Sequence, residues 1–168
     1  MKQVKVSLLL LALALLLAGC GVSDQDLLDS IPTMTIDAGR YRYQIAAGGY
    51  DWTTTDRFGR GASAITDAAH PLQVIDDLME VDLTGGEQAA LRFSRTPDAV
   101  EVTYWSAEDS VGSDGTTLET AFLDDAFLFT APEAEGQLVF QVTARWTSYE
   151  DVSGTVSYPF VTPAPAEE

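Results

Sequence analysis

Ten residues near the carboxyl end, 138–147, alternate between two sets of side chains, and this alternation is the feature that most constrains the fold. One set is apolar, Leu138, Phe140, Val142, Ala144 and Trp146, and the other is mostly polar, Val139, Gln141, Thr143, Arg145 and Thr147. Successive side chains of a β-strand point to opposite faces, whereas a helix would scatter both sets around its circumference. We therefore predict a long antiparallel strand with one face in a core.

The same period of two recurs along most of the chain between turns rich in Gly, Pro and Asp. We expect strands within 33–37, 40–45, 50–54, 78–83, 89–93, 100–105, 122–130 and 155–161. Residues 62–77 show no clear pattern, and Pro159 places the last strand at a sheet edge because proline has no N–H to donate. About seven to nine short strands predict an all-β fold, a two-sheet immunoglobulin-like β-sandwich.

The amino-terminal segment has the order of a secretory signal peptide. Two lysines precede an apolar run, 6–17, and two small residues follow it. The run has 12 residues, whereas a membrane-spanning helix needs about 20. The sequence Leu17-Ala18-Gly19-Cys20 resembles the lipobox of bacterial lipoproteins. That resemblance implies that signal peptidase recognises Leu17, Ala18 and Gly19, cleaves after Gly19, and leaves a diacylglyceryl group on the thiol of Cys20.

These observations divide the chain into four parts. Residues 1–19 form the cleaved signal helix, and residues 20–32 form the lipidated cysteine and a polar tether that has room for one helical turn at 24–28. The sandwich occupies 33–161, and 162–168 is a disordered tail. Two acyl chains hold a protein stably at a bilayer where one does not. We therefore expect a protein attached through lipid to the extracytoplasmic face of the cell membrane.

Charge excludes one class of partner. The chain has 9 basic and 26 acidic residues, and removal of residues 1–19 would leave seven basic against 26 acidic, a formal net charge of −19. Nucleic-acid binding depends on cations that neutralise phosphates, so we expect no nucleic-acid partner. Cys20 is also the only cysteine, and the domain therefore has no intramolecular disulfide and depends on packing.

No residue pattern predicts catalysis or a metal centre. His70 is the only histidine, and it is more readily interpreted as the cap of a turn before Pro71 than as the base of a triad with Asp67. One histidine cannot supply a zinc site. The acidic loop around Asp109 and Asp114 offers oxygen ligands for calcium, but its spacing does not fit an EF-hand. We expect no cofactor, with calcium at that loop as a weak alternative.

A group of aromatic and cationic residues is the best candidate for a ligand surface. It comprises Tyr50, Trp52, Arg57, Phe58 and Arg60, with Trp105 as a more distant member. Such residues stack on sugar rings or hold anions. The simpler interpretation, which we favour, places Tyr50 and Trp52 in the core. Trp105 is out of phase with Val102 and Tyr104, so it either ends its strand at a rim or faces a partner.

Several motifs together resemble an uncharacterised extracytoplasmic domain. They are Gly49-Tyr50-Asp51-Trp52, Asp67 with His70-Pro71-Leu72, Val100 to Trp105, Val142 to Trp146 and the closing strand from Gly154 to Phe160. That domain recurs in lipoproteins, and beside sensor-type membrane metallopeptidases, of Gram-positive gut bacteria. The resemblance covers about residues 33–161 and implies placement at the outer face of a single membrane. It supplies no catalytic residues.

Three functions remain open from the sequence. The first is a lipid-anchored, non-enzymatic β-sandwich that binds a surface ligand or an envelope protein. The second is a small envelope hydrolase with paired carboxylates, which needs a desolvated acid of raised pKa in a cleft. The third is an accessory subunit of a membrane sensor or transporter, which an exposed apolar patch would mark.

Overall fold

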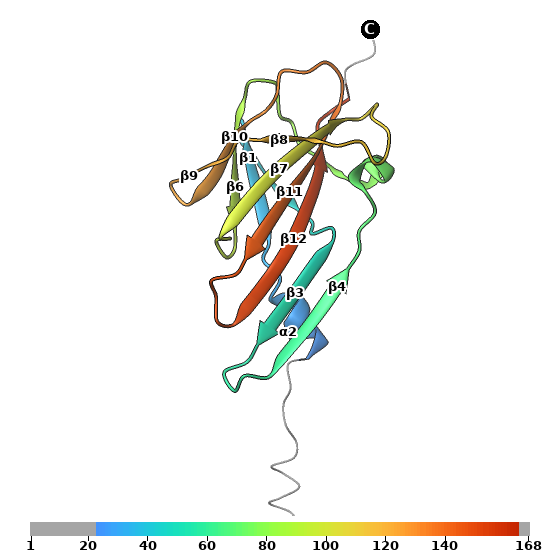
Figure 1. Cartoon of the computed structure of the whole chain (residues 1–168). Coiled ribbons are helices and arrows are strands. Elements are labelled where there is room, and N and C mark those ends of the chain that lie inside the picture. The colour runs from blue at the N-terminus through green and yellow to red at the C-terminus, as the bar shows by residue number, and fades with distance from the viewer. Residues whose placement is uncertain (1–22, 165–168) are drawn as a thin grey trace, which may run out of the picture.

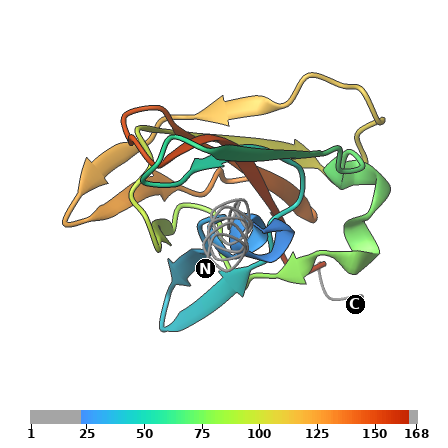
Figure 2. The ribbon, with the colours of Figure 1, turned by 90° about the horizontal axis from the view of Figure 1, so that it is seen from below.

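The predicted two-sheet β-sandwich is confirmed. The structure is a computed structural model that describes residues 23–164, and the two layers are visible in Figures 1 and 2. One sheet has the order β2(Tyr41–Ile45), β1(Met34–Ala38), β6(Gln88–Phe93), β10(Ala126–Thr130), β9(Ala121–Leu123). The other has the order β4(Gly61–Thr66), β3(Tyr50–Thr55), β12(Val152–Val161), β11(Leu138–Trp146), β7(Ala99–Ser106), β8(Thr116–Leu118), with β5(Met79–Glu80) beside β12.

Aromatic side chains fill the space between the sheets. The alternating residues that predicted β11 are all buried on its inner face. Trp146 meets Trp52 of β3 edge to face at 5.3 Å between ring centroids, and Phe140 stacks on Phe160 of β12 at 4.9 Å. Such pairs add to the large apolar area that each ring removes from water. The core therefore ties β3, β11 and β12 together.

The prediction that Pro159 lies in an edge strand is wrong, because β12 lies inside its sheet between β11 and β3. The N–H of Ser157 donates to Gly49 O, and Val161 O accepts from the N–H of Val81. The position where Pro159 lacks a donor therefore faces the same side, in the gap between Tyr50, where β3 begins, and Met79, where β5 begins. A proline fits inside this sheet because no strand pairs with it on that side.

The expected tether is shorter than residues 20–32. Helix α2(Asp24–Asp29) begins with a capping box in which Ser23 Oγ accepts from the N–H of Asp26. Leu27 is buried against the sandwich, and the indole N–H of Trp52 donates to Ser30 Oγ at 2.9 Å. The hydrophobic contact and the hydrogen bond make residues from Ser23 onward part of the domain.

The other end of the domain also extends beyond its predicted limit. Thr162, assigned to the tail, is buried, and its hydroxyl accepts from the N–H of Leu138 at 2.9 Å. Its own N–H donates to Leu138 O at 2.9 Å. These bonds extend the pairing of β12 with β11 by one residue.

Residues 61–77 hold the largest part of the fold that the sequence pattern did not predict. They contain β4 and two 3-10 helices, η1(Pro71–Gln73) and η2(Ile75–Asp77), whereas the short β5 lies within the strand expected at 78–83. The segment η1 packs on the outer face of β11, where Val139 is buried although its position predicted exposure. A second, smaller apolar cluster on this outer face therefore interrupts the simple alternation of buried and exposed positions.

The signal and anchor residues, Leu17, Ala18, Gly19 and Cys20, lie outside the described residues. Within 23–164, the structure contains no helix that is long and apolar enough to cross a membrane.

Candidate functional site

The structure separates the six residues of the predicted ligand surface. Trp52 is fully buried, and its place in the core confirms the interpretation we favoured over a ligand contact. Trp105 is also buried, at 7% exposure, because η1 and the loop before β8 cover it. Its ring meets His70 at 5.0 Å, and its indole N–H donates to Ser113 O at 3.1 Å. Trp105 is therefore neither a rim residue nor a partner surface.

Three of the six residues do lie together, at the tip of the β3–β4 hairpin, which we define as residues 56–60. Phe58 is 67% exposed, and the guanidinium carbons of Arg57 and Arg60 lie 4.8 and 5.3 Å from its ring centroid. Tyr50, at the other end of β3, packs against the core. The β3–β4 tip is therefore a small exposed aromatic and cationic group.

The carboxylate of Asp56 holds this tip in shape. It accepts from the N–H of Phe58 at 2.8 Å, the N–H of Arg60 at 3.0 Å, and the Nε–H of Arg60 at 2.8 Å. These donors lower the pKa of Asp56, the backbone N–H of Arg60 most of all. Gly59 has φ +76°, a left-handed conformation that favours glycine. The loop is thus organised before any ligand arrives.

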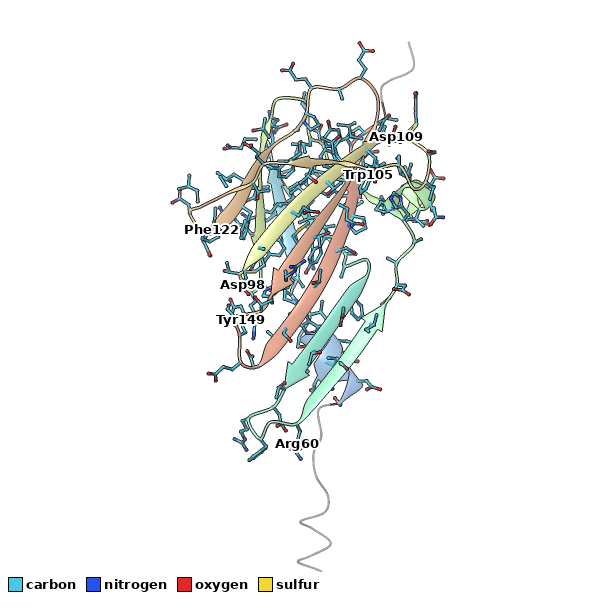
Figure 3. The ribbon with its side chains drawn as sticks, in the orientation of Figure 1. Arg60, Asp98, Trp105, Asp109, Phe122 and Tyr149 are labelled. Atoms are coloured by element: carbon cyan, nitrogen blue, oxygen red, sulfur yellow. The ribbon has the colours of Figure 1, made fainter. Side chains whose placement is uncertain are left out.

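A second exposed apolar group lies on the β9–β10 hairpin, and the sequence analysis did not select it. Phe122 and Leu123 of β9 are 56% and 57% exposed. β9 is the last strand of its sheet, so its outer edge has no strand partner in the described chain. Figure 3 shows Phe122 at the side of the sandwich, away from Arg60 of the tip. The run Ala121-Phe122-Leu123, directly before two aspartates, was the signal that could have identified it.

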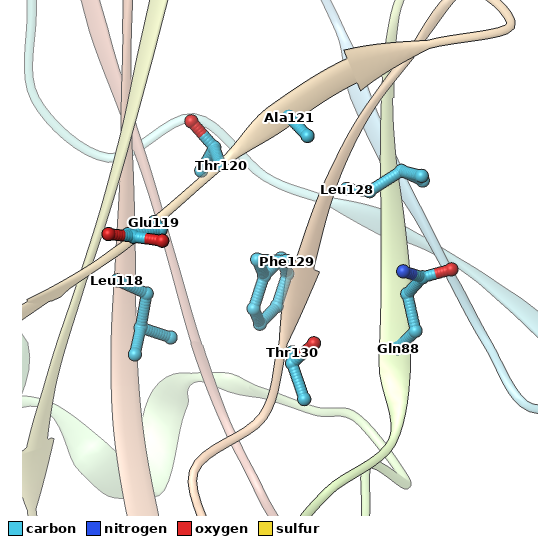
Figure 4. A pocket seen from close by; sticks show the side chains of 8 residues that line it. All are labelled: Gln88, Leu118, Glu119, Thr120, Ala121, Leu128, Phe129 and Thr130. Atoms are coloured by element: carbon cyan, nitrogen blue, oxygen red, sulfur yellow. The ribbon is translucent and has the colours of Figure 1, made fainter.

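A cleft adjoins this edge strand where the chain crosses from β8 to β9. It has a volume of about 390 Å³, and Figure 4 shows the side chains that line it. Phe129 forms its buried floor, Leu128 and Ala121 lie on one side, and Leu118 and Glu119 lie on the other. The cleft is therefore partly apolar, with a carboxylate on its wall.

The cleft also leaves part of the strand β10 unpaired. Pairing with β9 ends at Ala121 opposite Leu128. Ala131 exchanges backbone hydrogen bonds with residues 86 and 87, on the β6 side. The peptide groups of Thr130 therefore point the other way, toward the cleft, because successive residues of a strand alternate in direction. An extended segment placed here would find backbone hydrogen-bonding groups as well as an apolar floor.

Acidic groups surround this cleft and edge strand. Glu119 stands at the cleft, and Asp124 and Asp125 form the turn between β9 and β10 with φ of 51° and 60°. Arg92 donates to the backbone carbonyl of Asp124 at 3.2 Å, so its charge reaches the turn but not those carboxylates. We define the β9–β10 edge as β9, its turn and the adjoining cleft. This surface is apolar with a negative surround.

His70 and Asp109 have structural roles. His70 Nδ1 accepts from the N–H of Leu72 and begins η1, which confirms the capping interpretation. Asp109 accepts from the N–H of Ser106 at 2.9 Å. Within residues 23–164, neither Asp109 nor Asp114 joins a group of three or more His, Cys, Asp or Glu side chains that could hold a metal ion.

The aspartates of the described residues whose pKa is displaced are all displaced downward. The largest displacement is at Asp98, where the hydroxyl of Ser148 and the N–H groups of Thr147 and Ser148 lower the pKa to about 2. Asp26, Asp37, Asp56 and Asp151 follow the same direction, each through hydrogen bonds from neighbouring donors. A general acid of a hydrolase needs the opposite displacement. Asp37 and Asp151 instead form ion pairs with arginines, and Asp26 belongs to the capping box of α2.

Comparison with protein-family models, with curated proteins and with solved structures finds no match for this chain. The candidate function therefore depends on the geometry described above.

Proposed function

We propose that this protein is a lipid-anchored, extracytoplasmic binding protein whose β9–β10 edge receives an extended, basic segment of an envelope protein. The role is non-catalytic, and it places the chain beside a membrane protein as an accessory subunit or adaptor. One observation carries the proposal: an edge strand exposes Phe122 and Leu123 next to a cleft with free backbone groups.

Edge strands of soluble proteins are normally protected from pairing. Charged side chains, prolines or a covering loop usually prevent another chain from adding to them. Here β9 carries Ala121, Phe122 and Leu123, and all three are exposed. An apolar edge of this kind suits strand addition, in which main-chain hydrogen bonds give affinity and alternate side chains give specificity.

Charge selects the class of segment. Glu119, Asp124 and Asp125 surround the edge, and the chain without residues 1–19 has a net charge of −19. A segment with Lys or Arg beside apolar residues meets both the charge and the apolar floor, whereas an acidic segment is repelled. The cleft accepts a side chain of moderate size above Phe129.

A peptide selection tests this binding function. Random ten-residue peptides displayed on phage are selected against the lipid-bearing protein in vesicles, and binding of recovered peptides is measured by fluorescence polarisation. We expect basic residues alternating with apolar ones, and loss of binding in Phe122→Ala and Leu123→Asp. Phe58→Ala is the matched control, because it removes a comparably exposed phenylalanine from another hairpin. Recovered peptides that are acidic, or that bind all three variants equally, contradict the proposal.

The anchor is tested separately by mass spectrometry of the amino terminus. A protein produced in a bacterial host that matures lipoproteins should begin at Cys20 and carry a diacylglyceryl group, and Cys20→Ser should abolish both changes. An intact residue 1 and an unmodified thiol would remove the anchor from the proposal and leave the binding edge to be judged by its own experiment.

A further inference from the structure

The β3–β4 tip and helix α2 lie at the same end of the molecule. Figure 1 shows the hairpin extending past α2 at the lower end, and Figure 3 places Arg60 at the extreme of the hairpin. Helix α2 contacts β4 directly, and its residue Leu27 is buried. Figure 2 looks at the molecule from this end and shows α2 near the middle of the view. This end of the domain is therefore fixed as one surface.

The proposed anchor brings this surface to the membrane. Only Gly21 and Val22 lie between Cys20 and Ser23, the cap of α2, and each of the three residue steps covers at most about 3.5 Å in an extended chain. A lipid on Cys20 therefore holds α2 within about 10 Å of the bilayer surface. The domain has little freedom to stand away from the membrane, since its first helix is docked on the sandwich.

The tip has the composition that suits a membrane interface. Phe58 is the most exposed aromatic residue among the described large apolar side chains, at 67%. Two of the seven arginines of the chain flank it, at positions 57 and 60. Within the described residues Arg57 makes no ion pair, whereas Arg60 pairs with Asp56 at 2.8 Å. Amphipathic aromatic and basic groups gather at the level of lipid headgroups and phosphates.

The charge of the surroundings makes the tip the point of contact. Helix α2 carries Asp24, Asp26 and Asp29, which an anionic leaflet repels. The tip combines Arg57 and Arg60 with Asp56 and has a net positive charge. Because screening confines such effects to about 10 Å, the local charge decides the contact even though the whole chain is acidic.

We propose that the β3–β4 tip inserts Phe58 into the headgroup region of the bilayer that holds the lipid anchor, with Arg57 and Arg60 on lipid phosphates. This inference depends on the proposed anchoring at Cys20. Two contacts, the lipid and the tip, fix the tilt of the sandwich, so that the β9–β10 edge faces along the membrane rather than into it. A single flexible anchor would leave the edge in every orientation.

A single-thiol label tests the contact on the full chain. Phe58→Cys is produced in a host that matures lipoproteins, labelled with bimane, and reconstituted into vesicles of phosphatidylglycerol and phosphatidylcholine with brominated acyl chains. Phe122→Cys is the matched control, because its position is comparably exposed on the side of the sandwich. We expect bromine quenching and a blue-shifted emission at position 58, and neither at position 122.

A charge variant separates insertion from mere proximity. Arg57→Gln, added to the labelled Phe58→Cys chain, should reduce the ratio of inserted to free tip about fivefold in anionic vesicles, as removal of one cation near an anionic surface predicts. The reduction should be smaller in pure phosphatidylcholine. Equal quenching at positions 58 and 122, or an Arg57→Gln chain unchanged in anionic vesicles, overturns the proposal.

The same sample distinguishes failure of the contact from failure of the anchor. A lipidated Cys20 has no free thiol, so the mass spectrum shows one bimane and one diacylglyceryl group. Two bimanes and no lipid would remove the anchor and the tip contact together. One bimane, the lipid and no quenching at position 58 would remove the tip contact alone.

Discussion

Two hairpins of this sandwich each expose a phenylalanine, yet they differ in almost every other respect. Phe58 is on the β3–β4 hairpin between two arginines, whereas Phe122 is on the β9–β10 hairpin beside two aspartates. The first hairpin is joined to the core through Trp52, and the second lies at the end of its sheet with Phe122 resting on Phe127 at 4.8 Å. The difference teaches that the charges around an exposed aromatic side chain decide which partner to propose for it: lipid phosphate for Phe58 and a basic segment for Phe122.

The variant with the largest expected effect on stability removes Trp52, the residue that joins the β3–β4 hairpin to the core. Trp52→Ala deletes a fully buried indole, its contact with Trp146 and its hydrogen bond to Ser30. We expect a loss of about 3–5 kcal/mol in the free energy of unfolding, measured by urea denaturation. Helix α2 should also lose protection in hydrogen exchange, because Ser30 loses its partner. A loss below about 1 kcal/mol would show that the hairpin is as weakly joined as β9–β10.

Trp52 also shows how much of the structure could be predicted from the sequence. The pattern of residues 50–54 predicted a strand, and the interpretation we favoured placed Tyr50 and Trp52 in the core, but β4, the partner strand that completes the hairpin, was not predicted. Its hydrogen bond to Ser30 joins residues 22 positions apart and depends on where the helix docks. The alternation of side chains within one strand cannot predict a hydrogen bond to a distant helix.

The predictions for Trp105 and Pro159 were wrong for related reasons. The phase of Trp105 predicted exposure, but residues from a distant segment, His70 among them, cover it on the outer face of the sheet. Because Pro159 has no N–H to donate, we predicted an edge strand. The structure accommodates the proline inside the sheet, since the gap between β3 and β5 leaves no strand partner beside it. Local pattern determines which way a side chain points, and tertiary packing determines what it meets there. For the same reason the cleft beside β9 could not be predicted from the sequence, because its walls come from four strands and the β8–β9 connection.

Acid should loosen the region next to the tip hairpin. Asp98 accepts hydrogen bonds from Thr147 and Ser148 at the start of the β11–β12 connection. At the end of that connection, Asp151 O accepts from the N–H of Thr55 on β3. The folded-state pKa of Asp98, about 2, is below its ordinary value of 3.8. Its contribution is therefore present above about pH 4 and is lost as the pH falls toward 2.

Solvent screening at this exposed carboxylate limits the contribution to the order of 1 kcal/mol. Urea midpoints of the parent and of Asp98→Ala, measured at pH 6 and pH 2.5, should differ more at the higher pH and lie closer together at the lower. A constant difference between the two proteins across this range would show that Asp98 acts through packing rather than charge.

The turn of the β9–β10 hairpin should be improved by a glycine. Asp124 and Asp125 both have positive φ, the conformation of a type I′ turn, which favours Asp-Gly over Asp-Asp. Asp125→Gly should raise the free energy of unfolding by about 0.5 kcal/mol, because relief of the left-handed strain outweighs the added freedom of the unfolded chain. Thermal melts give the change. Asp124→Gly is the companion variant, and destabilisation by Asp125→Gly would show that the weak contact from Thr96 at 3.4 Å matters more than the turn.

The smallest expected effects on stability come from the two exposed phenylalanines themselves. Phe58→Ala should change the free energy of unfolding by less than about 0.5 kcal/mol, since its ring is largely exposed and lies against the guanidinium groups of two exposed arginines. Phe122→Ala should cost slightly more, about 0.5–1 kcal/mol, because it loses the ring contact with Phe127. Paired melts of the two variants measure this difference.

These near-silent changes are informative because folding does not explain either side chain. Removing a residue that stabilises the fold lowers the free energy of unfolding, whereas removing a residue that is exposed for a partner leaves it nearly unchanged. If Phe58→Ala instead lowers stability by several kcal/mol, the tip is part of the folding core and its arginines have a structural role. If it is silent for stability and the label at position 58 still reports the bilayer, the ring is at the surface for the membrane, and the contrast with Phe122 becomes a contrast between two partners.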